Sequence, residues 1–315
     1  MTHKQFVSLG KELLTPLYGE READALVRAL LQEVAGLGVY DYIMYPNKEL
    51  ALSALLVEHL QRLKAGEPLQ YILGYALFCD HKFMVTEDTL IPRPETEYLV
   101  NLIAGKQREK NVLSGSGESY NTLKILDLCT GSGCIAWSLA SMISNSVVWG
   151  CDISEAALAV AQRQGKEGFA GKLKNIPEFF KADLLSNGAL GVIESAMGFS
   201  ERENGGVDNG LDIMVSNPPY VLEEEKVFMQ RNVLEYEPHL ALFVDNSTPL
   251  LFYDKIVTLG THLLRPGGEL WFETNERFAD EVVSLMNDCG FARCEAMEDL
   301  NGKKRFVHGT WQKRN

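Results

Sequence analysis

The pattern of hydrophobic positions changes character near residue 70. Before that point, apolar residues recur at helical spacing in two stretches, residues 22–34 and 49–63. Pro46 and Asn47 separate the two stretches, and the turn residues Gly66-Glu67-Pro68 stop the second one. The pattern therefore predicts a small helical domain over residues 1–70, and this domain carries no catalytic signature of its own.

Residues 71–92 are predicted to connect this domain to a larger one over residues 93–315. Residues 69–85 are rich in Tyr, Ile, Phe and Val, which favours a β-hairpin or an extended linker. A helix should start near Pro94, because proline suits the first helical position and acidic residues suit the first turn. Residues 106–121 are polar and rich in Gly and Ser, and they predict a loop.

After this loop, stretches with the strand pattern alternate with stretches that have the helix pattern. Strands are predicted over residues 124–128, 147–151, 178–182, 211–215, 268–274, 291–297 and 304–311, and helices over residues 133–143, 154–167, 249–264 and 276–289. This alternation is typical of an α/β domain with a mostly parallel sheet covered on both faces. The last two strands have no helix between them and should pair antiparallel. Residues 186–210 lack periodicity and are predicted to be a mobile insertion outside the core.

Composition restricts the class of protein further. With 46% hydrophobic and 23% charged residues, the chain has the make-up of an ordinary globular protein. No apolar stretch approaches the roughly 20 residues of a membrane span, and the first residues lack the core of a signal peptide. We therefore expect a cytoplasmic protein. The six cysteines form no C-x-x-C pair, so we expect reduced thiols and no metal site.

The net charge of −13 bears on possible partners. Binding to a nucleic-acid backbone needs basic surface, so the charge argues against DNA or RNA as the main partner. It is compatible with a small substrate or a basic protein. An equally good interpretation is that the negative charge only keeps the protein soluble.

A glycine-rich loop lies at the first predicted strand-to-helix turn. Gly131, Gly133 and Ala136 match the pattern G-x-G-x-x-G/A, and Asp152 ends the next predicted strand. This spacing is that of a nucleotide-binding βαβ unit, in which the acidic residue accepts hydrogen bonds from ribose hydroxyls. NAD and S-adenosyl-L-methionine both carry such a ribose. The loop residues Cys129, Thr130 and Ser132 would then surround either cofactor.

Asp127 distinguishes the two cofactors, because it directly precedes the loop. There it would stand near the pyrophosphate of NAD, and two like charges ~4 Å apart cost about 4 kcal/mol at an effective dielectric of 20. S-adenosyl-L-methionine has no phosphate and carries a positive ammonium and a positive sulfonium. The acidic strand end therefore predicts S-adenosyl-L-methionine, with its carboxylate held by the loop amides at the helix N-terminus.

The third predicted strand offers groups for the adenine of this cofactor. Asp183 follows the strand and is placed to accept a hydrogen bond from the adenine amino group. Leu184 and Ile153 could pack on the two faces of the ring. A competing interpretation is that Asp183 only caps a turn.

The sequence Ser-Asn-Pro-Pro-Tyr at residues 216–220 follows the fourth predicted strand. Two prolines make a stiff corner that shows carbonyl oxygens and few donors. Asn217 Oδ1 and the Pro218 carbonyl could accept hydrogen bonds from both N–H bonds of a planar nitrogen, and Pro219 adds stiffness. The ring of Tyr220, rather than its hydroxyl, could stack on the planar group. The corner therefore predicts an acceptor site for an amide or an aromatic amine.

These motifs together resemble the HemK/PrmC class of protein-(glutamine-N5) methyltransferases from about Gly66 to the end of the chain. The resemblance is carried by residues 66–74, 90–97 (L-I-P-R-P-E-T-E), 126–136, 152–154, 216–220 and 264–268, and by Glu237-Pro238 and Ala241-Leu242. N-P-P-Y alone is shared with adenine-N6 DNA methyltransferases, whereas its combination with I-P-R-P-E-T-E is far more specific. The chain departs from the family at Cys129, where most members have glycine.

The resemblance implies a Rossmann-like class I methyltransferase domain with a seven-stranded sheet and a small helical N-terminal domain that recognises the protein substrate. It implies methyl transfer from S-adenosyl-L-methionine to the glutamine of the Gly-Gly-Gln motif in peptide chain release factors, with S-adenosyl-L-homocysteine as product. Asn217, Pro218 and Tyr220 would be catalytic, and Pro219 and Arg93 would help to bind the substrate. We expect a monomer that binds no membrane and no nucleic acid directly.

Three alternatives remain open at this point. A relative that modifies a glutamine of a ribosomal protein shares every motif named above. An adenine-N6 nucleic-acid methyltransferase shares the N-P-P-Y corner, although the acidic charge and the lack of a base-reading domain count against it. A non-catalytic binding module is disfavoured because Asp152, Asn217 and Tyr220 are all present.

Overall fold

The computed structural model describes residues 1–113, 122–167, 169, 173–199 and 210–312. The chain divides into two compact units. One comprises Met1–Tyr75 with Met229–Tyr236, and the other comprises Ala76–Phe228 with Glu237–Asn315. The predicted 71–92 connection is thus divided between the two units, and a short later segment groups with the helical one.

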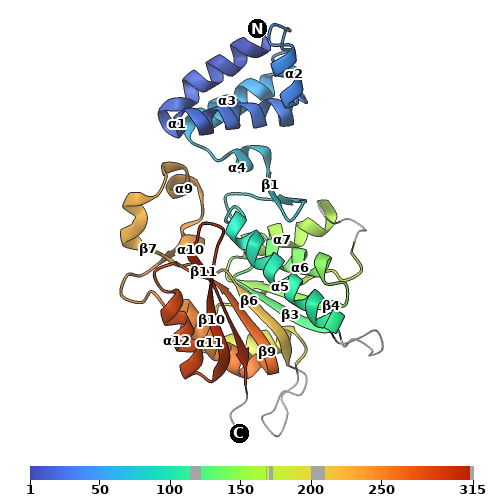
Figure 1. The fold of residues 1–315 in the computed structure, drawn as a ribbon, viewed down its shortest axis with the longest axis vertical. Helices are drawn as coiled ribbons and strands as arrows, with labels where there is room; N and C mark the ends of the chain where they lie inside the picture. Colours follow the sequence, from blue (N-terminus) through green and yellow to red (C-terminus); the bar gives the residue numbers. More distant parts are fainter. Residues whose placement is uncertain (114–121, 168, 170–172, 200–209, 313–315) are drawn as a thin grey trace. The chain divides into compact units, whose positions relative to one another are not determined.

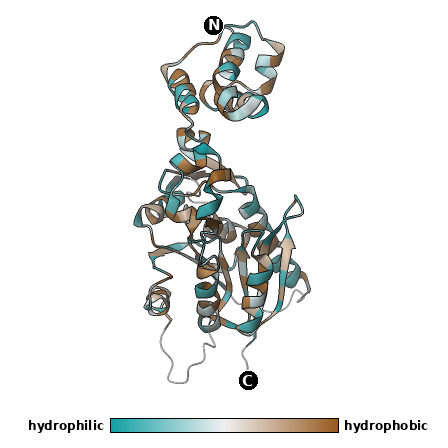
Figure 2. Ribbon diagram, turned by 90° about the vertical axis from the view of Figure 1, so that its left-hand side faces the viewer, coloured by the Kyte–Doolittle hydropathy of each residue, from teal (hydrophilic) through white to brown (hydrophobic). Residues whose placement is uncertain are grey.

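The first unit is helical, as the sequence predicts for residues 1–70. Its helices are α1 (His3–Ala35), α2 (Val39–Met44), α3 (Ala54–Ala65), α4 (Leu69–Leu73) and α9 (Arg231–Tyr236). Buried leucines of α1 and α3, with Phe6 and Val27, form its core. In Figure 2 the helices of this unit carry both hydrophobic and hydrophilic residues around their circumference, as expected for helices with one buried face.

Capping explains where these helices begin. Thr2 and Gln5 form a capping box at the start of α1. Helix α3 was predicted to begin at residue 49, but it begins at Ala54 because the Ser53 hydroxyl accepts a hydrogen bond from the Leu56 N–H at 3.1 Å.

The predicted hairpin exists but is shorter than residues 69–85. Strands β1 (Tyr75–Phe78) and β2 (His81–Met84) form a two-stranded sheet. Between them, Cys79 and Asp80 have φ of 46° and 61°, the left-handed values that a tight two-residue hairpin turn needs. The first residues of the predicted stretch form α4 instead. This helix ends at Gly74, whose φ of 77° is the left-handed value typical of a helix C-terminus, and β1 begins directly after it.

The second unit contains the seven-stranded sheet. Its strands are β3 (Leu123–Leu128), β4 (Ser146–Asp152), β5 (Glu178–Lys181), β6 (Leu211–Ser216), β9 (Leu264–Glu273), β10 (Phe291–Glu298) and β11 (Lys304–Trp311). Their order is β10-β11-β9-β6-β3-β4-β5. Only β11 runs against its neighbours β9 and β10, and the other pairs are parallel. The predicted fold class and the antiparallel final pair are confirmed.

Helices cover both faces of this sheet (Figure 1). Helices α5 (Pro94–Leu113), α6 (Cys134–Met142) and α7 (Glu155–Glu167) lie on one face, and α8 (Ala189–Ala196), α11 (Leu251–Leu263) and α12 (Ala279–Asp288) lie on the other. Successive residues of a strand point to opposite faces, so Ile125 and Ile213 pack under α5 and α6 while Leu126 and Met214 pack under α11. The central strands are therefore apolar on both sides.

Short elements complete this unit beyond the end of β6. They are β7 (Val221–Leu222), the 3₁₀ helix η1 (Glu223–Phe228), α10 (His239–Leu242) and β8 (Phe243–Val244). Strands β7 and β8 pair in parallel and form a sheet of their own. None of these elements was predicted, because each is too short to show a hydrophobic period.

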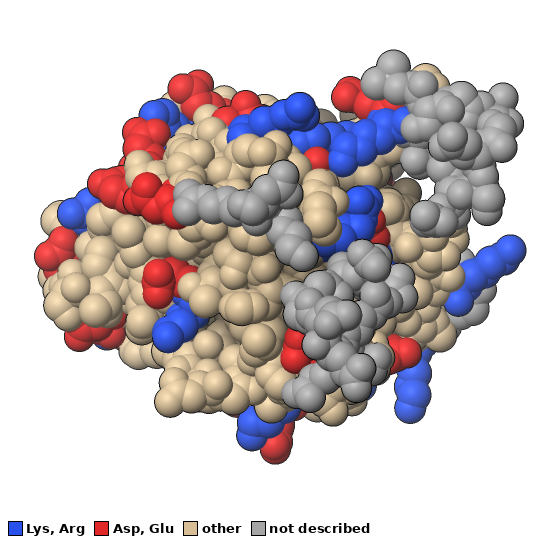
Figure 3. Space-filling model, turned by 90° about the horizontal axis from the view of Figure 1, so that it is seen from below, with Lys and Arg blue, Asp and Glu red and all other residues tan. Residues whose placement is uncertain are grey.

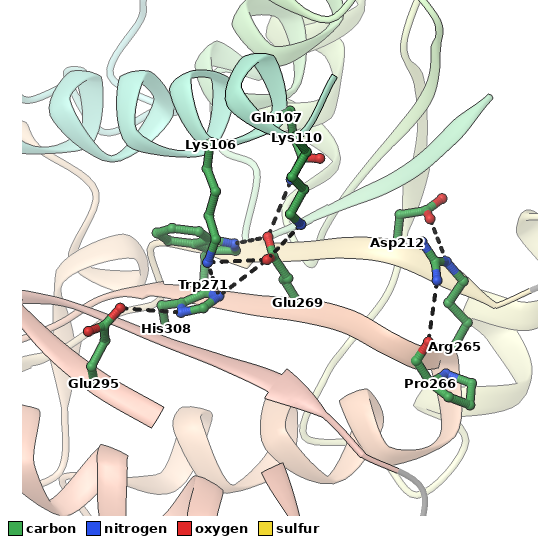
Figure 4. Close-up of polar contacts among 10 residues, drawn as sticks. All are labelled: Lys106, Gln107, Lys110, Asp212, Arg265, Pro266, Glu269, Trp271, Glu295 and His308. Carbon is green, nitrogen blue, oxygen red and sulfur yellow. Dashed lines mark hydrogen bonds and ion pairs between the residues drawn. The ribbon is translucent and has the colours of Figure 1, made fainter. Parts of the chain in front are cut away.

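Two predicted loops are partly helical. Residues 106–113 continue α5, and residues 189–196 form α8, whereas residues 114–121 and 200–209 lie outside the described residues. The polar side chains that suggested a loop at residue 106 are used inside the fold (Figure 4). Lys110 Nζ lies 2.8 Å and Gln107 Nε2 3.3 Å from the carboxylate of buried Glu269 on β9.

Glu269 is the centre of a cluster of charged and polar groups in the second unit. Lys106 Nζ lies 3.2 Å from this carboxylate and 2.9 Å from His308 Nε2. The Trp271 indole N–H also donates to Glu269, at 3.3 Å. These contacts hold the pKa of Glu269 well below its usual range although burial acts in the opposite direction. The cluster fastens the second half of α5 to β9 and β11.

Candidate functional site

A pocket lies where strands β3, β4, β5 and β6 end, at the edge of the sheet where open α/β proteins bind ligands. Eight residues predicted from sequence contribute to its wall: Cys129, Gly131, Asp152, Ile153, Asp183, Leu184, Asn217 and Pro219. Further lining residues are Asp88, Thr89, Leu90, Ser154, Ala157, Ala182, Leu185, Pro238, Leu240, Ala241 and Phe252. The topology thus brings together residues from seven separate parts of the chain.

The glycine loop has the sharp backbone that its pattern predicts. Gly131 and Gly133 have φ of 53° and 79°, and Gly133 directly precedes α6. Cys129 has φ of 60°, a left-handed conformation that glycine adopts at less cost than cysteine. Burial raises the pKa of the Cys129 thiol far above its usual value, so this group is a neutral part of the wall.

Asp152 joins the end of β4 to the glycine loop. Its Oδ2 accepts a hydrogen bond from the Gly131 N–H, and its Oδ1 accepts one from the Ser154 N–H, both at 2.9 Å. Each carboxylate oxygen has a further lone pair for a ligand hydroxyl. Burial raises the pKa of Asp152, and the backbone hydrogen bonds oppose that rise. The carboxylate is therefore fixed in position before any ligand arrives.

Asp127 lies beneath the loop and is not among the described residues that line the pocket. It is 0% exposed, and its Oδ2 accepts hydrogen bonds from Thr130 Oγ1 at 2.5 Å and from the Ala136 N–H at 3.2 Å. Its Oδ1 is buried and has no hydrogen-bond partner among the described residues. Burial raises the pKa of Asp127 to about 7.

Three other predicted cofactor residues shape the loop and do not line the pocket. Thr130 holds Asp127, the Ser132 carbonyl accepts a hydrogen bond from Gln164 Nε2 at 3.2 Å, and Gly133 starts α6. Thr130 and Ser132 are both buried. Their effect on a ligand would be indirect, through the shape of the backbone.

Asp183 has a place in the pocket wall and also caps a turn, and its contact with adenine stays a prediction. It lines the pocket, and its Oδ1 also accepts a hydrogen bond from the Leu185 N–H at 3.0 Å, which is a turn cap. The two predicted ring-packing residues differ in exposure. Leu184 is 6% exposed, whereas Ile153 is 41% exposed and offers its side chain to a ligand.

The Ser-Asn-Pro-Pro-Tyr corner follows β6 at the same edge of the sheet. Asn217 and Pro219 line the pocket, while Pro218 is buried and Tyr220 is not among the lining residues. The Tyr220 hydroxyl donates to Glu273 Oε1 at 3.0 Å. The hydroxyl therefore holds the ring in place, and the stacking of this ring on a substrate amide stays a prediction.

Asn217 is connected to the same carboxylate through a threonine. Its Nδ2 donates to Thr96 Oγ1 at 3.1 Å, and the Thr96 hydroxyl donates to Glu273 Oε2 at 2.6 Å. Glu273 is 1% exposed, and burial raises its pKa while the hydrogen bonds from Thr96 and Tyr220 oppose the rise. Sequence analysis missed both residues. Thr96 lies in the I-P-R-P-E-T-E motif, which was a signal, but nothing in the sequence singled out Glu273.

Arg93 does not line the pocket but is tied to a residue that sequence analysis gave no role. Its Nη2 donates to Glu237 Oε1 at 2.5 Å, and Glu237 Oε2 accepts the Ile91 N–H at 3.2 Å. Glu237 is 4% exposed. This ion pair holds the segment before α5 against the segment before α10, and both segments contribute to the pocket wall.

The pocket wall is acidic. Asp88, Asp152 and Asp183 line it, and the described lining residues include no Lys, Arg or His. Such a wall disfavours phosphates and favours a ligand with positive charge. The preference for S-adenosyl-L-methionine over NAD therefore has support from the whole wall and not only from Asp127.

Comparison with known proteins agrees with this geometry. The family model described as "PrmC N-terminal domain" matches residues 7–74. A release factor glutamine methyltransferase of Bacteroides thetaiotaomicron is 36% identical, over 94% of this chain and 96% of the relative. The enzyme of the same name from Flavobacterium psychrophilum is 38% identical, over 94% of each chain.

A solved structure offers a further comparison. It is the release factor-specific protein-(glutamine-N5) methyltransferase of Alicyclobacillus acidocaldarius, which is 24% identical with a TM-score of 0.38, over 73% of this chain and 99% of that one. The sequence relatives, which match over nearly their whole length, confirm the resemblance seen in the motifs. The chain belongs to the family of release factor glutamine methyltransferases.

Proposed function

We propose that this protein transfers a methyl group from S-adenosyl-L-methionine to the side-chain nitrogen of the glutamine in the Gly-Gly-Gln motif of peptide chain release factors. One observation carries the proposal. An acidic pocket that suits a cationic cofactor includes Asn217 and Pro219 of the Ser-Asn-Pro-Pro-Tyr corner in its wall. Cofactor and acceptor amide can therefore meet at one place, and the names of the sequence relatives supply the substrate.

The residues of the pocket fit the cofactor. Asp152 has lone pairs for the ribose hydroxyls, Asp183 has an oxygen for the adenine amino group, and Ile153 offers an apolar surface for the ring. Asp127 lies beneath the loop with its Oδ1 buried and without a hydrogen-bond partner among the described residues, and the negative charge of its ionised form would attract a positively charged ligand in the pocket. When bound, S-adenosyl-L-methionine supplies an electrophilic methyl group on its sulfonium.

The corner prepares the acceptor nitrogen. An amide nitrogen is a poor nucleophile because its lone pair is delocalised into the carbonyl group. Asn217 Oδ1 and the Pro218 carbonyl would accept hydrogen bonds from its two N–H bonds, which raises electron density on nitrogen and aims its lone pair at the methyl group. The proline-stiffened backbone holds both oxygens in advance. No strong base is needed, because the methylated nitrogen becomes acidic and loses its proton afterwards.

Two alternatives remain weaker. For an adenine-N6 nucleic-acid methyltransferase we would expect a basic surface. On the face in Figure 3, outside the grey residues, lysines and arginines are interspersed with aspartates and glutamates instead of forming one basic patch. A ribosomal-protein substrate would use the same corner, but the relatives' names favour a release factor.

Several expectations about partners stay predictions. They are substrate recognition by the helical unit, the monomeric state, the absence of direct nucleic-acid binding and the cytoplasmic location. Among the residues described, no helix combines the length and the apolar character that a membrane crossing needs.

The substrate can be tested with labelled S-adenosyl-L-methionine and three purified acceptors: release factor, ribosomal protein and DNA. We expect transfer to the release factor with the highest kcat/KM. A release factor with its Gly-Gly-Gln glutamine replaced by alanine is the matched control and should receive no label. Equal labelling of that control, or faster transfer to either of the other acceptors, would contradict the proposed substrate.

The pKa of Asp127 predicts a pH dependence for cofactor binding. A cationic ligand favours the charged carboxylate, and burial raises the pKa of this group to about 7. Affinity should therefore fall as pH decreases through 7, by up to about tenfold per pH unit below the pKa. Calorimetric titrations below the pH at which the cofactor ammonium loses its proton measure this, with Asp127→Asn as a control in which the pH dependence should be weaker. Affinity that stays constant or rises on acidification would be the opposite of the expected result.

A further inference from the structure

Glu273 lies where three segments of the second unit meet. It is the last residue of β9, Thr96 lies in the first turn of α5, and Asn217 and Tyr220 follow β6. Both oxygens of its carboxylate are used: Oε2 accepts from Thr96 Oγ1 at 2.6 Å and Oε1 accepts from the Tyr220 hydroxyl at 3.0 Å. When Glu273 is ionised, its carboxylate can only accept hydrogen bonds. In that state both hydroxyls direct their protons at Glu273.

The direction of the hydrogen bond from Thr96 to Glu273 determines the role that Thr96 plays in its contact with Asn217. A hydroxyl has a single proton, and that of Thr96 is given to Glu273. Thr96 Oγ1 can then only accept from Asn217, so the contact at 3.1 Å must come from the Nδ2 side of the amide. The other side of the amide, Oδ1, is left for the pocket. Without an acceptor behind Thr96, the amide could equally turn its NH₂ group to the pocket, where it would repel the N–H bonds of a substrate amide.

We infer that Glu273, acting through Thr96, is a positioning residue that fixes the orientation of the Asn217 amide so that an acceptor oxygen faces the methyl acceptor. The same carboxylate holds the ring of Tyr220 through its hydroxyl. A second contact supports the corner from the same side, since Asn275 Nδ2 donates to the Tyr220 carbonyl at 3.3 Å. The end of β9 thus orients the corner from behind, although Glu273 and Thr96 do not line the pocket. The inference rests on the proposed function.

Two variants of nearly unchanged shape test it. Thr96→Val removes the hydroxyl, so the amide of Asn217 loses the contact that orients it. Glu273→Gln replaces one acceptor oxygen by a donor, so the side chain can no longer accept from both hydroxyls. Thr96→Ser restores the hydroxyl. Thr261→Val is the matched control, because it removes a threonine hydroxyl that donates only to the Thr258 carbonyl within α11.

Single-turnover transfer to release factor and calorimetric cofactor affinity should respond differently. In Thr96→Val and Glu273→Gln the transfer rate should fall by about 10-fold, which corresponds to the loss of one hydrogen bond. Cofactor affinity should stay within about twofold of the wild-type value. Thr96→Ser should recover most of the rate. The double variant should be no slower than the slower single one, because both residues act through Asn217. Wild-type transfer by Thr96→Val, or effects that multiply in the double variant, would overturn the inference.

A second measurement does not depend on methyl transfer. The side-chain amide resonance of Asn217 can be identified in ¹H–¹⁵N spectra by its absence in Asn217→Asp. It should shift in Thr96→Val and in Glu273→Gln and stay in place in Thr261→Val. If the wild type methylated no release factor, the proposed function would fail while this shift would still support the hydrogen-bond chain. An Asn217 resonance that is unchanged in both variants would disprove the chain itself.

Discussion

Asn217→Ala should slow methyl transfer to a release factor by about 10²–10³, the usual cost of removing one preorganised hydrogen-bonding group from a closed site. The side chain lines the pocket, and its Oδ1 is one of the two oxygens proposed to hold the acceptor nitrogen. Removing it leaves one N–H of the substrate amide unpaired. Cofactor affinity should change much less, because Asp152, Asp183 and the glycine loop remain.

Single-turnover kinetics, with cofactor affinity measured in parallel, separate the two effects. Pro219→Ala is a useful companion variant, because it keeps the side chain of Asn217 and removes only part of the stiffness of the corner. We expect a smaller loss of rate for it. If Asn217→Ala transferred at nearly the wild-type rate, the corner after β6 would not be the acceptor site.

Asp152→Ala should reduce the affinity for S-adenosyl-L-methionine by at least about 100-fold. Loss of two ribose hydrogen bonds to a charged acceptor costs roughly 1.5–3 kcal/mol each. The substitution also releases the Gly131 and Ser154 N–H groups, each held at 2.9 Å, so the glycine loop loses a support as well. Calorimetric titration with the cofactor measures the change.

The control for this variant is Glu155→Ala, three residues further along. Glu155 is an exposed residue that pairs with Lys181 at 2.9 Å and does not line the pocket. Its replacement should leave cofactor affinity unchanged. Equal affinities for the wild type and Asp152→Ala would remove Asp152 from the cofactor site.

Elements with a clear period were predictable from sequence, and so was the edge of the sheet that forms the pocket. Strands such as β3 and β6 are buried on both faces and therefore read as continuous apolar runs, and their order in the chain places Asp152 and Asn217 at the same edge. Helix α5 was predicted too short. Its second half, beyond Lys106, is stabilised by Glu269, which lies 159 residues away from Lys110 in the chain.

The contacts that Thr96, Glu237 and Glu273 make could not be predicted, because their partners are distant in sequence. Thr96, Glu237 and Glu273 act through hydrogen bonds across 121, 144 and 53 residues of sequence, to Asn217, Arg93 and Tyr220 respectively. A local pattern carries no information about such partners. For Asp127, the position in the chain predicted that it lies next to the glycine loop. Only the fold reveals that it lies under the loop and not in the pocket wall.

The most direct test of the account is to locate the transferred methyl group. The protein is incubated with S-adenosyl-L-methionine and a release factor, and the modified peptide is fragmented in a mass spectrometer. The account predicts one methyl group on the side-chain nitrogen of the Gly-Gly-Gln glutamine, and almost none in the same time with Asn217→Ala. A methyl group on another residue, or undiminished methylation by Asn217→Ala, would contradict it.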